Sequence, residues 1–215
     1  MIRLQEYFNE RAAVADFMRR LCEKGLTTSL GGNISLRIGE HVLITPAKID
    51  KSRLTPDQVG IISMKGENLT PDIELSIETG MHFCVLQNRT DISAVIHAHP
   101  TIATLFTAMN VDINTTLTVE AFAVLGVPLK APYAGVGTKE LAYSVSEAAQ
   151  KSNVILMENH GIVTVGSSLL EAFNRMEVLE STAKMNWIMK SFKKSCIKPL
   201  TPQSLEEVAK KSEKK

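Results

Sequence analysis

Long hydrophobic runs are absent from this sequence of 215 residues. No apolar stretch approaches the roughly 18 to 20 residues that a bilayer-spanning helix needs, so we expect no membrane partner. Residues 1–17 carry charges where a signal peptide requires an apolar stretch, which argues against export. Cysteine is also scarce: Cys22, Cys84 and Cys196 lie far apart and are odd in number, as is typical of reduced thiols. Together these absences predict a cytoplasmic protein.

A strong net charge is lacking as well. The formal net charge is +1, and residues 193–215 hold seven lysines against three glutamates. The first 192 residues are therefore slightly acidic, with a net charge of −3. Because a nucleic-acid binder usually shows a basic patch or stripe, we expect no nucleic-acid partner. We predict one domain over residues 1–192 and a basic, frayed C-terminal tail over residues 193–215.

Apolar residues are plentiful enough for one sizeable core, since 44% of the chain is hydrophobic and 22% is charged. Helices are predicted where apolar residues recur at helical spacing and strands where short apolar runs stand between turn residues. The predicted helices lie around residues 14–21, from Ser76 as N-cap to about 88, from Pro100 to about 109, and over 138–150 and 169–187; the predicted strands lie within 29–46 and at 59–64, 93–99, 154–157 and 162–165. This mixture indicates an α/β or α+β layered fold.

Three histidines stand at predicted strand ends. His97 and His99 are two apart in an apolar strand, so their side chains project from the same face. His160 lies in the turn Glu-Asn-His-Gly between two apolar strands, where Gly161 is expected to take a positive φ. Three imidazoles with an open fourth position form the donor set of a catalytic zinc site, although other first-row divalent metals accept similar ligands. The alternative is that each ring is satisfied by ordinary hydrogen bonds.

Polar residues elsewhere offer further candidates. Glu78 is expected in the first turn of the helix capped by Ser76, either as an acid–base group or merely as compensation for the helix dipole. His82 shares a helix face with Glu78; it is either a partner that supports the site or a half-buried polar side chain, and we favour the second interpretation. Gly31 and Gly32 form a turn whose backbone N–H groups can approach an anion, and Asn33 and Ser35 could add donors. Taken alone, this glycine pattern is weak.

Six motifs in a fixed order then point to a known family. They are GGNIS, VLITPAKID, SIET, AVIHAH, PYAGVGT and LMENHGIVTVG, spread over residues 8–192. In order and spacing the sequence resembles the class II aldolase/adducin family, and within it the L-fuculose-phosphate aldolase-like enzymes. The resemblance implies a single three-layer α/β/α domain around a largely antiparallel central sheet, with residues 1–192 as the catalytic domain. It also implies a homo-oligomer, usually a tetramer, with active sites between subunits.

The resemblance also assigns roles to residues. It implies one zinc ion per chain bound by His97, His99 and His160, with Glu78 as the catalytic carboxylate. It implies that the substrate phosphate is bound by Gly32, Asn33, Thr45 and Ser76. Two family donors are missing, because Ala47-Lys48 replaces Thr-Gly and Ile77 replaces a serine, and we expect the Lys48 ammonium to compensate. The family's tyrosine proton donors are missing too: Thr118 stands at one position and the tail has no tyrosine.

The implied activity is that of a zinc-dependent lyase acting on a small sugar phosphate. A ketose 1-phosphate would be cleaved to dihydroxyacetone phosphate and an aldehyde. Two alternatives use the same scaffold, a methylthioribulose-1-phosphate dehydratase and a pentulose-phosphate 4-epimerase, although the epimerase branch usually has aspartate where Glu78 stands. A non-catalytic adducin-like interaction module is less favoured, because the three histidines and Glu78 are intact. A cupin-type oxygenase would need a glutamate soon after His99, and none is present there.

Overall fold

The computed structural model describes residues 7–193 and 197–212. Its centre is a seven-stranded sheet of order β3-β2-β1-β4-β7-β6-β5. Only the β5–β6 pair is parallel; the other pairs are antiparallel. The strands are β1 (Asn33–Ile38), β2 (His41–Ile44), β3 (Gly60–Ser63), β4 (Ala94–Ala98), β5 (Leu129–Ala131), β6 (Val154–Met157) and β7 (Gly161–Gly166).

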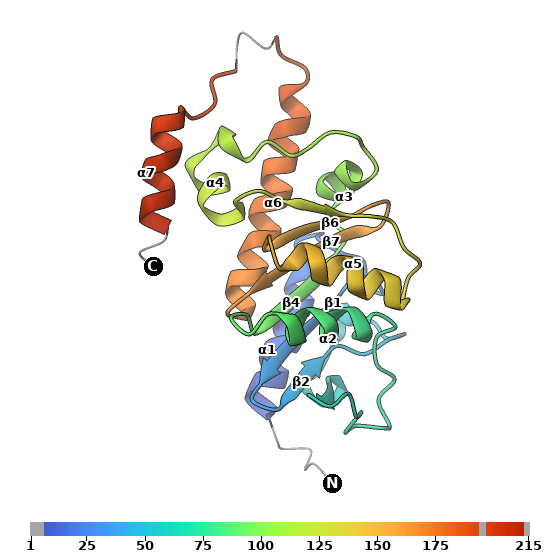
Figure 1. Ribbon diagram of the computed structural model, residues 1–215. Helices are drawn as coiled ribbons and strands as arrows, with labels where there is room; N and C mark the ends of the chain where they lie inside the picture. Colours follow the sequence, from blue (N-terminus) through green and yellow to red (C-terminus); the bar gives the residue numbers. More distant parts are fainter. Residues whose placement is uncertain (1–6, 194–196, 213–215) are drawn as a thin grey trace.

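Helices cover both faces of this sheet (Figure 1). The helices are α1 (Phe8–Glu23), α2 (Thr79–Asn88), α3 (Thr101–Thr107), α4 (Val119–Leu125), α5 (Lys139–Ala149), α6 (Leu169–Met189) and α7 (Pro202–Ser212), with short 3-10 turns η1 (Lys51–Arg53), η2 (Pro56–Gln58) and η3 (Thr115–Leu117). One core joins the sheet to α1, α3, α4 and α6, and a second joins it to α2 and α5. The predicted three-layer α/β/α arrangement around a largely antiparallel sheet is confirmed.

The alternation of side chains along β4 connects the two cores. Ala94, Ile96 and Ala98 belong to the core on the α1 and α6 side, whereas Val95 belongs to the core on the α2 and α5 side. His97 has the same parity as Val95, so it faces the α2 side. All five residues of the strand are buried. Full burial of an aliphatic side chain such as that of Ile96 stabilises the fold by about 1.5–3 kcal/mol, so the strand that carries His97 is firmly held.

Two local expectations are wrong. Gly161 does not take a positive φ; Asn159 does, at 54°. Helix α2 begins at Thr79 with Glu78 as the N-cap residue, so Ser76 is not the N-cap and Glu78 precedes the first turn. The reason is tertiary: Leu75 forms an antiparallel bridge with Pro46, and the N–H of Ala47 donates to the carbonyl of Glu74 at 2.8 Å. This pairing keeps the chain extended just before the helix.

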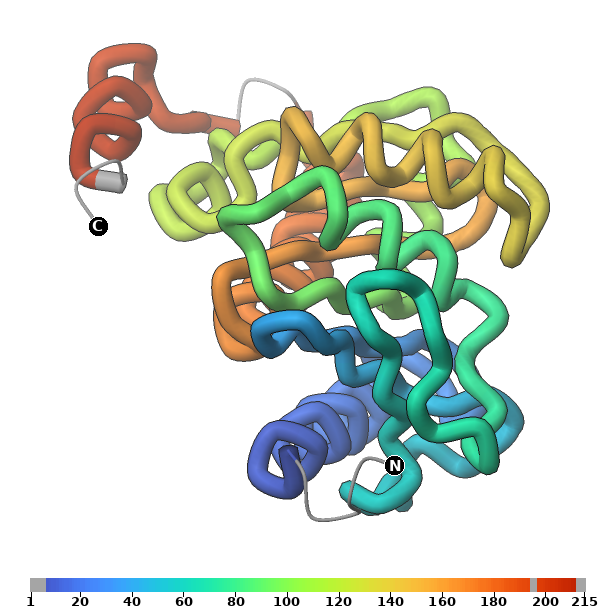
Figure 2. Tube along the Cα trace, turned by 60° about the horizontal axis from the view of Figure 1, so that its bottom comes forward, coloured from blue at the N-terminus to red at the C-terminus, as the bar shows by residue number. Residues whose placement is uncertain are grey.

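The C-terminal segment contains α7, which contacts α4 and stands at the outer end of the molecule (Figure 2). Residues 194–196, which include Cys196, and residues 213–215 lie outside the described part, and the domain boundary at residue 192 stays a prediction. Cys22 and Cys84 are free thiols, as expected. Within residues 7–193 and 197–212, no helix combines the length and apolar character of a membrane span.

Candidate active site

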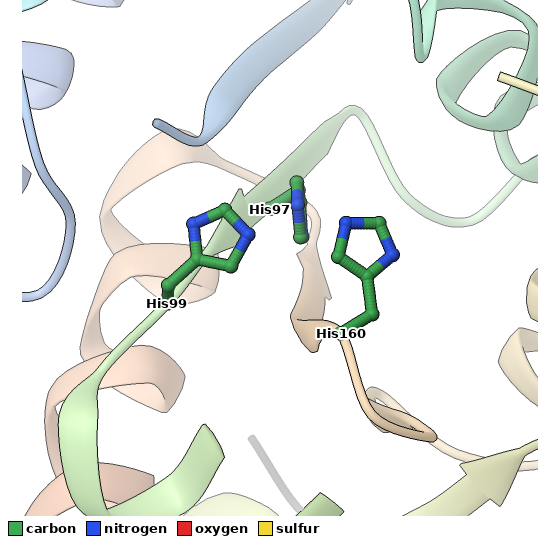
Figure 3. A group of neighbouring side chains, drawn as sticks. All are labelled: His97, His99 and His160. Carbon is green, nitrogen blue, oxygen red and sulfur yellow. The ribbon is translucent and has the colours of Figure 1, made fainter. Parts of the chain in front are cut away.

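Three imidazoles converge at one end of β4 and β7 (Figure 3). His97 lies in β4, directly opposite Asn33 of β1 and Val163 of β7. His99 follows the strand, where its backbone N–H donates to the carbonyl of Leu26 at 3.0 Å. His160 lies in the turn between β6 and β7. One potential ligand atom from each of the three histidines lies within 4.8 Å of the others, so the structure brings together the set predicted from sequence.

The hydrogen bonds of His97 define which nitrogen is free. Its Nδ1 lies 2.9 Å from the carbonyl oxygen of Ile162, and a carbonyl can only accept, so Nδ1 carries the proton. The Nε2 atom therefore has a lone pair, and it is buried without a hydrogen-bond partner among the residues that the structure describes. Burial, and then the neighbouring His99 and His160, hold the pKa of His97 well below its usual range, so the ring is neutral. A neutral imidazole is the form that binds metals.

Glu78 completes the cluster. Its Oε2 lies 3.3 Å from Nε2 of His97, and its Oε1 lies 3.4 Å from Nε2 of His160. Asn33 donates from Nδ2 to Glu78 Oε2 at 2.8 Å. Within residues 7–193 and 197–212, both Glu78 Oε1 and Nδ1 of His160 are buried without a hydrogen-bond partner. Unpartnered atoms of this kind on two imidazoles and one carboxylate fit a divalent cation, and a group of three histidine nitrogens suits zinc.

The cluster opens into a cavity of about 660 Å³. Its lining includes Glu78, His99 and His160, together with most of the predicted phosphate-binding residues: Gly32, Asn33, Lys48 and Ser76. Thr45 is absent from this lining, because its buried hydroxyl accepts a hydrogen bond from the N–H of Ile34 at 3.1 Å. A second cavity of similar volume lies beside α5, but it is lined by neither histidine nor any other residue of the cluster.

Two lysines line the histidine-containing cavity in different ways. Lys48 is exposed, has a φ of 55°, and places its ammonium 2.6 Å from Glu74. Lys51 is buried, with 4% of its surface exposed, and its Nζ donates to the carbonyl of Gly32. Burial lowers the pKa of Lys51, while the negative charge of Glu78 opposes that shift. Sequence reasoning missed Lys51, since nothing local separates a buried lysine from the solvated one three residues before it.

His82 is also placed differently from our expectation. It is fully buried rather than half-buried, because α2 packs tightly over the sheet at this point. Its Nδ1 lies 2.7 Å from the hydroxyl of Ser35, and its Nε2 lies 2.5 Å from Oδ1 of Asn33. Ser35, proposed from sequence as a possible anion donor, is buried beneath the cavity and bonded to this ring.

Gly161 is required for a steric reason. A Cβ atom at this position would lie 2.6 Å from Cδ2 of His99 and 3.0 Å from Cε1 of His97. We expect Gly161→Ala to push the two rings apart and to weaken metal binding by roughly 10- to 100-fold, as when the supports of metal ligands are disturbed. Competition with a chromophoric chelator measures this affinity. Gly80→Ala is the control, because nothing lies within 4 Å of its Cβ. Equal affinities for Gly161→Ala and Gly80→Ala would contradict the steric argument.

Comparison with known proteins shows the family to which the chain is similar. The family model for the class II aldolase and adducin N-terminal domain matches residues 12–187. The chain is 35% identical to the L-fuculose phosphate aldolase of Methanococcus maripaludis over 81% of this chain and 94% of that protein. It is 30% identical to the 5-deoxy-D-ribulose 1-phosphate aldolase of Bacillus thuringiensis over 95% of each chain. It is 31% identical to the 3-oxo-tetronate 4-phosphate decarboxylase of Haemophilus influenzae, over 78% of this chain and 81% of that one.

Among solved structures, an L-fuculose 1-phosphate aldolase superposes with a TM-score of 0.86 at 30% identity and covers 94% of this chain and 95% of its own. Fold and site thus define an enzyme of the lyase class from a family that is typically metal-dependent. The chain belongs to the class II aldolase and adducin family.

Proposed function

We propose that this protein is a zinc-dependent aldolase that cleaves and forms a carbon–carbon bond of a ketose 1-phosphate, giving dihydroxyacetone phosphate and an aldehyde. One observation carries the proposal: the carboxylate of Glu78 faces Nε2 of both His97 and His160 at the inner end of one cavity. The 1-phosphate aldolases among the relatives support the same substrate class. A cytoplasmic location, inferred from the cysteine content and the N-terminal sequence, belongs to the same proposal.

The metal would be held by His97, His99 and His160. When bound, zinc supplies a Lewis acid that withdraws electron density from substrate oxygens as the carbon–carbon bond breaks. Because Nδ1 of His97 is fixed by the carbonyl of Ile162, this ring presents Nε2 without reorientation. Preorganised ligands of this kind raise the affinity for the metal.

Glu78 is the proposed acid–base group. In the condensation direction its carboxylate accepts the C3 proton of dihydroxyacetone phosphate, and in the cleavage direction it returns a proton to that carbon. Only 6% of the Glu78 surface is exposed, so bulk water competes weakly for this proton. The hydrogen bond from Asn33 Nδ2 orients the carboxylate toward the cavity end where His97 and His160 lie.

The phosphate would bind near Gly32, Asn33 and Ser76, with Lys48 as the nearby exposed cation. The Lys48–Glu74 ion pair is largely exposed, and such pairs contribute at most about 1 kcal/mol. The Lys48 ammonium can therefore leave Glu74 for a substrate anion at low cost. Thr45, also predicted as a phosphate contact, would act indirectly by holding the backbone of Ile34.

No tyrosine of the same subunit is placed to donate a proton to the aldehyde oxygen, since Tyr7, Tyr133 and Tyr143 do not line this cavity. Thr118, at the family's tyrosine position, does not line it either. Leu30, Ile77 and Val136, by contrast, line the cavity and are largely exposed. We therefore propose a homotetramer in which a neighbouring subunit covers this apolar mouth and supplies the missing group.

We expect Lys48→Met to raise KM for a phosphorylated ketose several-fold while kcat is nearly kept, because a point charge binds substrate and transition state alike. The effect should weaken as salt rises, since the site is partly open to solvent. Steady-state kinetics on phosphorylated and unphosphorylated forms of one substrate measure it. Lys65→Met, in an exposed turn after β3, is the matched control. Unchanged KM for the phosphorylated form would remove Lys48 from the phosphate site.

A decarboxylase of a phosphorylated 3-oxo acid is the second candidate, favoured by one observation. Two lysines line the cavity, and Lys51 is buried near Glu78 with a single hydrogen bond from Nζ to the described residues. A substrate with both a phosphate and a carboxylate carries two anionic groups that such a pair could match. The relative from Haemophilus influenzae bears this activity in its name. In that reaction the bond to the carboxylate carbon breaks, carbon dioxide leaves, and a proton takes its place.

One substrate panel separates these candidates. Zinc-loaded protein is incubated with ketose 1-phosphates, pentulose phosphates, methylthioribulose 1-phosphate and phosphorylated 3-oxo acids. An aldolase should produce dihydroxyacetone phosphate. A decarboxylase should release carbon dioxide, a dehydratase should give a dehydrated product, and an epimerase should give an epimer. Absence of triose phosphate from every ketose would refute the aldolase, and no turnover of any compound would favour the interaction module.

A further inference from the structure

A buried network of hydrogen-bonded polar side chains lies beneath the cavity. Ser35 and Asn33 are two apart in β1 and face α2, where His82 stands between them. Ser35 and His82 are fully buried, and Asn33 is 3% exposed. His82 does not line the cavity, so it does not touch a substrate bound there. These hydrogen bonds join residues up to 49 positions apart in the sequence, so they do more than cap a helix locally.

The donor and the acceptor of each hydrogen bond between Glu78, Asn33, His82 and Ser35 follow from which groups can only accept. Asn33 Nδ2 lies 2.8 Å from Glu78 Oε2, and a carboxylate only accepts, so the amide NH₂ group must face Glu78. The amide oxygen of Asn33 must then face His82, whose Nε2 has to carry the proton. Nδ1 of His82 is left as an acceptor for the hydroxyl of Ser35 at 2.7 Å. Burial lowers the pKa of His82 to about 3, so the ring carries one proton, and its two hydrogen-bond partners place that proton on Nε2.

We propose that His82 is a positioning residue: its Nε2–H holds the amide of Asn33 in the single orientation that donates to Glu78. This inference rests on the proposed acid–base role of Glu78. Without the Nε2–H donor, only the contacts of Asn33 Nδ2 with Glu78 and with Ser76 Oγ, at 2.8 and 3.0 Å, resist rotation of the amide, which can then present its oxygen to the carboxylate. The two oxygens then repel each other, and Glu78 is released from the position between His97 and His160.

The kinetic test compares His82→Phe with His82→Gln. Phenylalanine keeps the ring volume but removes the donor, whereas the glutamine amide restores an N–H toward Asn33. We expect His82→Phe to lower kcat roughly 10- to 100-fold, as displacement of a catalytic group by about 1 Å can do, with KM and metal content nearly unchanged. His82→Gln should recover most of that loss. A merely structural role would lower thermal stability in His82→Phe and leave kcat of the folded fraction unchanged.

A spectroscopic test needs no activity. With ¹⁵N-labelled histidine, the His82 ring of the intact enzyme should show a protonated Nε2 and an unprotonated Nδ1 from about pH 5 to pH 8. The other tautomer, or a doubly protonated ring, would overturn the proposal. This measurement also decides the case if His82→Phe does not fold.

Glu78→Gln, assayed beside these variants, distinguishes failure of the positioning role of His82 from failure of the acid–base role of Glu78. If Glu78→Gln loses turnover and folded His82→Phe does not, the positioning role is wrong and the proposed function stands. If Glu78→Gln keeps the wild-type rate, the acid–base role itself fails. Recovery in His82→Gln with the expected tautomer supports the positioning role, and equal loss in both folded His82 variants contradicts it.

Discussion

Glu78→Gln is expected to lower kcat by roughly 10²- to 10⁴-fold, the usual contribution of a general acid–base group. Glutamine has nearly the same shape, so the cavity and the contact with Asn33 are conserved, but it cannot accept a proton. Metal content should change little, because the three imidazoles remain. Initial rates at saturating substrate, with elemental analysis of the same samples, measure both quantities.

The matched control is Glu67→Gln, which makes the same chemical change in an exposed turn after β3. It should retain the wild-type kcat. Wild-type turnover by Glu78→Gln would contradict the acid–base role and leave Glu78 only as the N-cap residue of α2. A large loss of metal in Glu78→Gln would instead make the carboxylate a fourth ligand.

His97→Ala or His160→Ala is expected to reduce bound metal from about one ion per chain to a small fraction. Each change removes a donor nitrogen from a cluster whose atoms lie within 4.8 Å of one another. Elemental analysis after dialysis measures the loss. Chelation of the wild-type protein should also lower Tm, because a metal that binds only the folded state adds about 2.7 kcal/mol when its free concentration is 100-fold above Kd.

His41→Ala is the control for this experiment. His41 begins β2, and its Nδ1 is hydrogen-bonded to the hydroxyl of Tyr7 at 2.8 Å, away from the cluster. It should retain full metal content. Near-stoichiometric metal in both His97→Ala and His160→Ala would show that the ion binds elsewhere.

The convergence of the three histidines could be predicted from sequence because its signal is local. The two-residue spacing of His97 and His99 in an apolar run fixes a common face, and the Asn-His-Gly turn between two strands fixes His160 at a strand end. The start of α2 could not be predicted, because a bridge between Leu75 and Pro46 overrides the capping signal of Ser76. The short strand β5 and helix α4 were also missed, since their segments have weak periodicity.

The supports of the site were beyond sequence reasoning for the same physical reason. The ammonium of the buried Lys51 donates to the carbonyl of Gly32, which comes from another loop. His82 and Asn33 are 49 residues apart, and no pattern within either segment indicates that they meet. Candidate ligand and catalytic side chains can be predicted from residue type and spacing. The positions of the residues that orient them depend instead on how α2 packs on the sheet.

The central place of β4 has a consequence for how the enzyme is made. Its neighbours are β1, where Asn33 lies opposite His97, and β7, where Val163 lies opposite the same residue. Both pairings close long loops, and such nonlocal contacts form slowly during folding. During synthesis from the N-terminus, β7 is the last of the seven strands to emerge. A nascent chain that has not yet reached His160 therefore lacks both this histidine and β7, the strand that flanks β4, so the three imidazoles can come together only after β7 has been synthesised.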